Sequence, residues 1–142
     1  MSKESALAQI GAVSSRVGRV HIEKVIHEFF ASYPATCVDD VLPRAALFAE
    51  DATIEDPVGA DAIAGKREIG RFFRETVESG WIIHMVSEKT IVCGNEAISL
   101  TRAAWGKGDV APAHVDIVHN FVFNDEGLIC RVRVFFDQGT IR

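Results

Sequence analysis

The sequence has few of the features that mark secreted, membrane or nucleic-acid-binding proteins. It contains only three cysteines, Cys37, Cys93 and Cys130, with no C-x-x-C pair, which favours reduced thiols in a cytoplasm over a disulfide framework. No apolar run approaches the roughly 20 residues of a membrane span, and the N-terminus lacks the regions of a signal peptide. The formal net charge is −5 without a basic patch, so neither nucleic acid nor a membrane is an expected partner.

What is present is the composition of an ordinary globular protein. Of the 142 residues, 48% are hydrophobic and 25% are charged, which suits one domain with a substantial core. Residues 1–20 are mostly small and polar and include Gly11 and Gly18, so they predict a loose or weakly helical N-terminal extension. The globular domain is therefore expected over residues 21–142.

The first half of this domain has the periodicity of helices. Apolar residues recur at spacings of three and four over residues 21–33, and Pro34 ends that pattern. Further helices are predicted over residues 40–48 and 66–77. After Gly80 the pattern alternates with a period of two, which predicts strands over residues 81–92, 97–105, 112–123 and 128–136. The order indicates an α+β fold, with three helices packed on a curved antiparallel sheet.

The stretch at residues 52–59, ATIEDPVG, has the pattern of a short strand that ends in a turn. Because strand side chains alternate, Ala52, Ile54 and Asp56 share one face, which the two apolar residues mark as buried. Pro57 cannot continue a hydrogen-bonded ladder, and Gly59 permits a sharp turn. A carboxylate on an apolar face needs a partner, a proton or a chemical role. The alternative is that Asp56 turns back to cap a loop N–H group.

His119 is the second polar residue in an apolar row. On the strand at 112–123 it shares a face with Val115, Ile117, Phe121 and Phe123. It is either a core imidazole with one satisfied nitrogen or an acid–base group.

The opposite face of that strand mixes polar and apolar side chains. His114 and Asp116 lie there two residues apart, but no further ligand has a suitable spacing, so no metal site is expected. The same face carries Val118, Asn120 and Val122, a mixture typical of an interface, and predicts a homodimer.

Two segments resemble a known family. The run LFAEDATIEDPVG at residues 47–59, followed by Gly65 and Phe72, resembles bacterial Δ5-3-ketosteroid isomerases of the NTF2-like (SnoaL-like) superfamily. The sequence FVFN at residues 121–124, followed by Gly127 and the strand RVR at 131–133, is similar to the last hairpin of that family. The resemblance implies a conical α+β barrel around a deep hydrophobic pocket, and dimers formed through the outer sheet face.

The resemblance also implies roles for individual residues. Asp56 falls on the family's catalytic base, which moves a proton next to a ketone. His119 falls where the isomerases have a protonated aspartic acid that hydrogen-bonds the enolate. The family's second donor is a tyrosine on the first helix, where the spacing here gives His27 or Glu28, while Tyr33 at the helix end is the only tyrosine. The sequence leaves the choice between His27 and Tyr33 open.

The resulting hypothesis is a cofactor-independent steroid Δ-isomerase-like enzyme that acts on a steroid or polyketide-like substrate. The alternatives are a SnoaL-like cyclase or dehydratase, and a protein that binds a hydrophobic ligand without catalysis. Aromatic residues at such spacings belong to a core more often than to a contact surface. The expected pocket lining consists of Phe30, Phe48, Phe72, Trp105 and Phe121.

The two inward residues carry expectations of their own. If Asp56 and His119 face one pocket, they should approach to roughly 4–8 Å, the span of one bound atom or water. Apolar surroundings raise the pKa of a carboxyl group and lower that of an imidazole. We therefore expect a neutral His119 and an activity that rises with pH to a plateau. A cationic His119 would instead give a bell-shaped profile.

Overall fold

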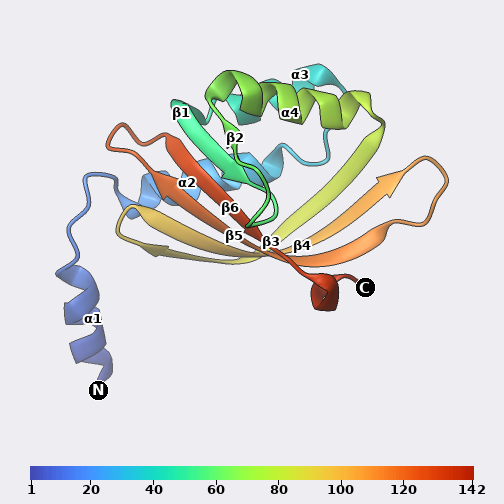
Figure 1. Cartoon of the computed structure of the whole chain (residues 1–142). Coiled ribbons are helices and arrows are strands. Elements are labelled where there is room, and N and C mark those ends of the chain that lie inside the picture. Colours follow the sequence, from blue (N-terminus) through green and yellow to red (C-terminus); the bar gives the residue numbers. More distant parts are fainter.

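The computed structural model describes all 142 residues. The chain folds into helices that pack on a single six-stranded sheet (Figure 1). None of the helices is long and apolar enough to cross a membrane. In chain order the elements are α1 (Lys3–Gly11), α2 (Arg19–Ala31), α3 (Val38–Ala45), β1 (Phe48–Glu55), β2 (Ile63–Ala64), α4 (Lys66–Glu78), β3 (Trp81–Cys93), β4 (Glu96–Lys107), β5 (Ala113–Phe123), β6 (Ile129–Phe135) and the short 3-10 helix η1 (Gln138–Thr140).

The sheet is curved and does not close into a barrel. Its strand order is β2-β1-β6-β5-β4-β3, so the sheet has β2 at one edge and β3 at the other. The last four strands form an antiparallel meander, but β1 runs parallel to β6. The expectation of a wholly antiparallel sheet was therefore wrong at this pair. No hairpin joins β1 to β6, because α4 and four strands lie between them in the chain, so nothing local forces an antiparallel pairing.

Three helices cover the concave face of this sheet, which confirms the α+β class (Figure 1). Helix α2 packs against β3, α4 packs against β1 and β3, and α3 lies beside α4. The helices contribute Ile22, Phe29, Ile69 and Phe73 to the core, where they meet the inward residues of the strands. The core thus fills the space between the helices and the central strands.

One helix ends earlier in the structure than the sequence predicts. The helix expected over residues 40–48 is α3, which ends at Ala45, and Phe48 begins β1 instead. The reason is a distant contact: Phe48 pairs with Ile129 of β6, whose N–H donates to the Leu47 carbonyl at 2.9 Å. The apolar run at residues 45–48 suits either a helix or a strand, and the pairing with β6 decides.

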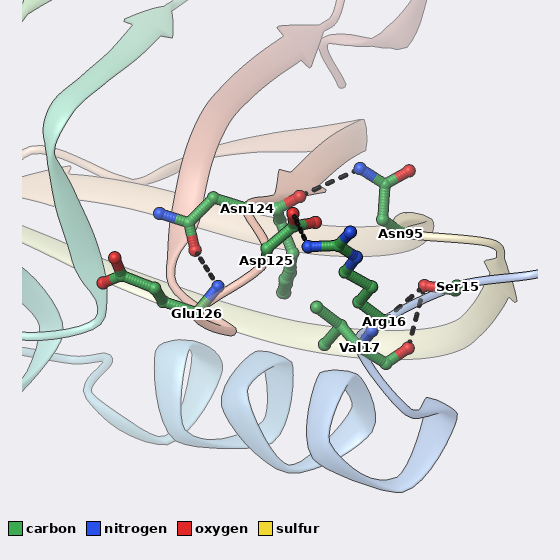
Figure 2. A network of polar contacts seen from close by, with 8 residues as sticks. Ser15, Arg16, Val17, Asn95, Asn124, Asp125 and Glu126 are labelled. Atoms are coloured by element: carbon green, nitrogen blue, oxygen red, sulfur yellow. Dashed lines mark hydrogen bonds and ion pairs between the residues drawn. The ribbon is translucent and has the colours of Figure 1, made fainter.

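The N-terminal extension forms α1, which stands apart from the rest of the fold and has no buried residue (Figure 1). Figure 2 shows how the segment after α1 is held to the turn between β5 and β6. Arg16 Nη1 lies 3.2 Å from Asp125 Oδ2, and Val17 beside it is buried. The exposed ion pair contributes little stability by itself, so the burial of Val17 supplies most of this attachment.

Candidate active site

Asp56 follows directly after β1 and continues one face of that strand. Ala52 and Ile54 on this face are buried, as the alternation predicted, and Asp56 borders two cavities beneath the helices. Glu55 lies on the other face, where its carboxylate is 3.4 Å from Arg133 Nε. The backbone turns away after Pro57, and Gly59 adopts a positive φ of 97°. The carboxyl group of Asp56 is thereby held at the end of the strand, at the mouth of the cavities.

The surroundings of Asp56 disfavour its charged form. The residue as a whole is exposed, because it lies on the bend after β1. The pKa instead depends on the surroundings of the carboxyl group, which faces apolar side chains, and burial there raises the pKa of Asp56 above its usual range. Asp56 takes part in none of the ion pairs, and desolvation is the one cause of its pKa shift, so its carboxyl group is free to accept a proton from a ligand.

His119 lies deep in the sheet on β5, with 2% of its surface exposed. Its ring stacks on Phe121 with centroids 5.8 Å apart, and the Phe30 ring lies nearly perpendicular to it with centroids 5.3 Å apart. Nδ1 is hydrogen-bonded to Thr101 Oγ1 of β4 at 3.2 Å. Desolvation by burial lowers the pKa of His119 to about 4, so the imidazole is neutral at physiological pH.

Two small adjoining cavities connect these groups. The inner chamber has a volume of about 40 Å³ and the outer chamber about 100 Å³. Both chambers are bordered by Tyr33, Asp56, Phe72, Phe73, Met85 and Trp105. The inner chamber adds His119 with apolar neighbours from β1, β5 and β6, and the outer chamber adds Ala35, Arg44, Thr76, Val77, Trp81 and Ile83. The helices and the sheet therefore bring Asp56, Tyr33 and His119 around the inner chamber.

The predicted aromatic lining divides into two groups. Phe72 and Trp105 border both chambers. Phe48 and Phe121 are fully buried in the core, and Phe30 packs against the His119 ring, so none of these three borders either chamber. These three were expected to line the pocket, and in the structure each packs on other core side chains instead.

Of the two first-helix candidates for a hydrogen-bond donor, only Tyr33 reaches the chambers. His27 is exposed on α2 and borders a shallow surface depression beside β3 instead. Tyr33 lies two residues past the end of α2. Its pKa is raised, first by burial, with Arg44 lowering it and Asp56 raising it. The phenol is therefore a neutral donor near the Asp56 carboxylate.

Arg44 is a site residue that sequence reasoning missed. It is 3% exposed on α3, and its guanidinium lies 3.5 Å from the centre of the Tyr33 ring and 4.7 Å from that of Phe73. Burial lowers its pKa, with Tyr33 opposing the shift. The available signal was its position three residues after Val41, on the buried stripe of α3.

A larger groove lies elsewhere. It has a volume of about 630 Å³ and is bordered by Leu100, Arg102, Asp116, Val118 and Phe135, with neither Asp56 nor His119. These residues belong to the outward face of the sheet, away from the helices. No group of three or more histidine, cysteine, aspartate or glutamate side chains is placed to hold a metal ion.

Comparisons with known proteins agree with this architecture. Residues 26–132 match the SnoaL-like domain family. The steroid Delta-isomerase of Nocardioides simplex is 33% identical over 95 residues, which cover 67% of this chain and 75% of that protein.

Two solved structures of similar fold also match. The epoxide hydrolase/cyclase-like enzyme SalBIII, described in pyran ring formation in polyether salinomycin, has a TM-score of 0.73 at 23% identity, covering 84% of this chain and 93% of its own. A computationally designed 17-OHP binder has a TM-score of 0.72 at 22% identity, covering 86% of this chain and 97% of its own. At these identities the two structures show a shared fold.

Proposed function

Since the chain belongs to the SnoaL-like domain family, within the NTF2-like superfamily, we propose that it is an isomerase that shifts a double bond by proton transfer next to a ketone. The observation that carries this proposal is the pairing of Asp56 and His119 around one apolar chamber. Active sites that carry out acid–base chemistry commonly contain titratable groups whose pKa values are displaced by their surroundings, as those of Asp56 and His119 are. The similarity to a steroid Delta-isomerase supports the same reaction type.

In the proposed reaction, the ionised Asp56 carboxylate takes a proton from the carbon next to the ketone. The electrons of the broken C–H bond form an enolate, whose oxygen accepts hydrogen bonds from Tyr33 and His119. Asp56 then returns the proton to the far end of the enolate system, so the double bond moves and no atom is gained or lost. Thr101 Oγ1 lies 3.2 Å from His119 Nδ1, and the proposed reaction requires the hydroxyl to donate to Nδ1, so that the His119 proton lies on Nε2 and is available to the substrate. Preorganised donors in a dry site stabilise developing negative charge strongly.

The test is turnover of two β,γ-unsaturated ketones, 5-androstene-3,17-dione and the smaller 3-cyclohexen-1-one, followed by ultraviolet absorbance of the conjugated product. The smaller ketone is included because the two chambers together have less volume than the ~300–1,000 Å³ of typical ligand pockets, so a small substrate fits them more readily than a steroid. Asp56→Asn should lower turnover by about 10²–10⁴-fold, the usual contribution of a general base. Asp61→Asn, a change at an exposed aspartate of the following loop, is the matched control. Wild-type rates equal to buffer with both ketones, or equal rates in Asp56→Asn, would remove the proposal.

A second candidate is binding without chemistry. It is favoured by the designed 17-OHP binder, which has the same fold. This function requires a hydrophobic ligand to raise the melting temperature of wild type and Asp56→Ala equally, with the ligand recovered unchanged from both. The same product analysis detects the third candidate, a cyclase or dehydratase. Such an enzyme would convert the ligand into a product with a new ring or one water fewer, whereas a binding protein would return it unchanged.

We also propose that two copies pair through the outward face of the sheet. Large apolar side chains are exposed there, including Val86 at 64% and Ile91 at 52%, beside the 630 Å³ groove. Burial of such a patch favours association. Light scattering at micromolar concentration should give twice the 15.5 kDa of one chain, and a monomer mass would contradict this proposal.

A further inference from the structure

The outer chamber contains a buried cation that no carboxylate of the chain neutralises. Arg44 takes part in none of the ion pairs, all of which lie nearer the surface. Its Nε donates to Ser32 Oγ at 2.7 Å and its Nη2 to the Ser32 carbonyl at 3.2 Å. A desolvated charge without a counterion is costly, so an anion in its reach would be bound strongly.

Two residues that border this chamber each carry a donor group without a protein acceptor. Nη1 of Arg44 donates to no protein atom, since both hydrogen bonds of the guanidinium leave from Nε and Nη2. The indole Nε1 of Trp105 is buried and has no hydrogen-bond partner at all. Both residues border the outer chamber. Buried polar groups in folded proteins are rarely left unpaired, so the indole N–H group indicates a missing acceptor, and Nη1 of Arg44 is available to donate to it.

A carboxylate is an anionic hydrogen-bond acceptor of the kind that this pair of donors lacks. It is planar, accepts through two oxygens, and matches the fork of a guanidinium in both shape and charge. A neutral carbonyl would satisfy one hydrogen bond and leave the charge of Arg44 uncompensated. Ser32 and the Tyr33 ring already hold the guanidinium in place, so little ordering is needed when the anion binds.

We propose that the outer chamber is a carboxylate subsite, in which Arg44 and Trp105 hold the acid group of a hydrophobic oxo acid. The ketone of the same molecule lies beside Asp56 and His119 in the inner chamber, and this second placement rests on the proposed function. The volume of about 100 Å³ suits an acid group with a short carbon chain. The substrate class is therefore a ketone that carries a carboxylate a few carbons away.

The experiment compares 4-oxopentanoate with its methyl ester by isothermal titration calorimetry at pH 7.5. These ligands share the ketone and the chain, and they differ in charge and by the methyl group of the ester. Wild type should bind the acid about tenfold or more tightly than the ester, the value of a hydrogen bond to a charged group. Arg44→Met should abolish that preference, and Trp105→Phe, which removes the indole N–H group together with part of the ring, should reduce it. Arg67→Met, at an exposed arginine of α4, should leave it intact.

Equal binding of acid and ester by wild type would overturn the subsite, as would a preference that survives in a folded Arg44→Met. If Arg44→Met does not fold, because Arg44 joins the end of α2 to α3, an unchanged preference in Trp105→Phe overturns it instead. Slower turnover in Arg44→Met with an unchanged ratio of acid to ester binding would also overturn the subsite, because Arg44 would then act only on the enolate. The measurement needs no turnover, so a subsite without isomerase activity refutes only the proposed function, and Asp56-dependent turnover without acid preference refutes only the subsite.

Discussion

The neutral state of His119 should make the fold sensitive to mild acid. In the unfolded chain its imidazole has the ordinary pKa of 6.5, whereas burial among aromatic rings lowers the folded value to about 4. Between these values the unfolded chain holds a proton that the folded chain excludes. The contribution of this neutral imidazole is therefore fully present above pH 6.5 and is lost as the pH falls toward 4.

The magnitude follows from the width of that window. A difference of one pKa unit corresponds to about 1.4 kcal/mol, so the full loss is roughly 3 kcal/mol once the pH is below both values. At pH 5 about 2 kcal/mol of it should already be lost relative to pH 7.5. That is a large share of the ~5–15 kcal/mol that stabilises a typical domain.

The assay is urea unfolding of wild type and His119→Gln at pH 7.5 and pH 5, because their difference cancels the titration of all other groups. Wild type should lose about 2 kcal/mol more than the variant between these values. His84→Gln, at an exposed histidine of β3, controls for the removal of any imidazole. Equal losses in wild type and His119→Gln, or an NMR titration of the His119 ring near pH 6.5 in the folded protein, would refute the argument that burial dominates.

Three further predictions test the remaining parts of the site. Isomerase activity should rise with pH through the raised pKa of Asp56 and then stay flat, because His119 is already neutral; a falling alkaline limb that disappears in His119→Gln would contradict this. Phe48→Ala should lower the free energy of unfolding by about 3–5 kcal/mol in urea titrations with an unchanged KM, whereas a raised KM at full stability would mean that Phe48 contacts substrate. Thr101→Val should weaken catalysis by about 1 kcal/mol, near fivefold in kcat, and shift the His119 tautomer signals in nitrogen NMR; unchanged signals would exclude Thr101 as the group that orients the ring.

Local patterns determined the elements and the faces of this protein. Strand alternation assigned Asp56 to the face of Ala52 and Ile54, and it assigned His119 to a buried row. These statements need only the spacing of neighbours in the chain, because side chains on a strand alternate wherever the strand lies. The motif at residues 47–59 supplied the family, which residues 26–132 confirm.

Which faces meet was decided only by the tertiary structure. The pairing of Phe48 with Ile129 turned a predicted helix end into a strand, and the path after α2 brought Tyr33 rather than His27 to the chambers. The position of Arg44 on the buried stripe of α3 did not reveal its contacts, because these depend on the Tyr33 and Phe73 rings, which reach it from other segments of the chain. Periodicity fixes the direction of a side chain relative to its own element, whereas its partners depend on how distant elements pack, and that is why periodicity alone did not identify the residues that line the chambers.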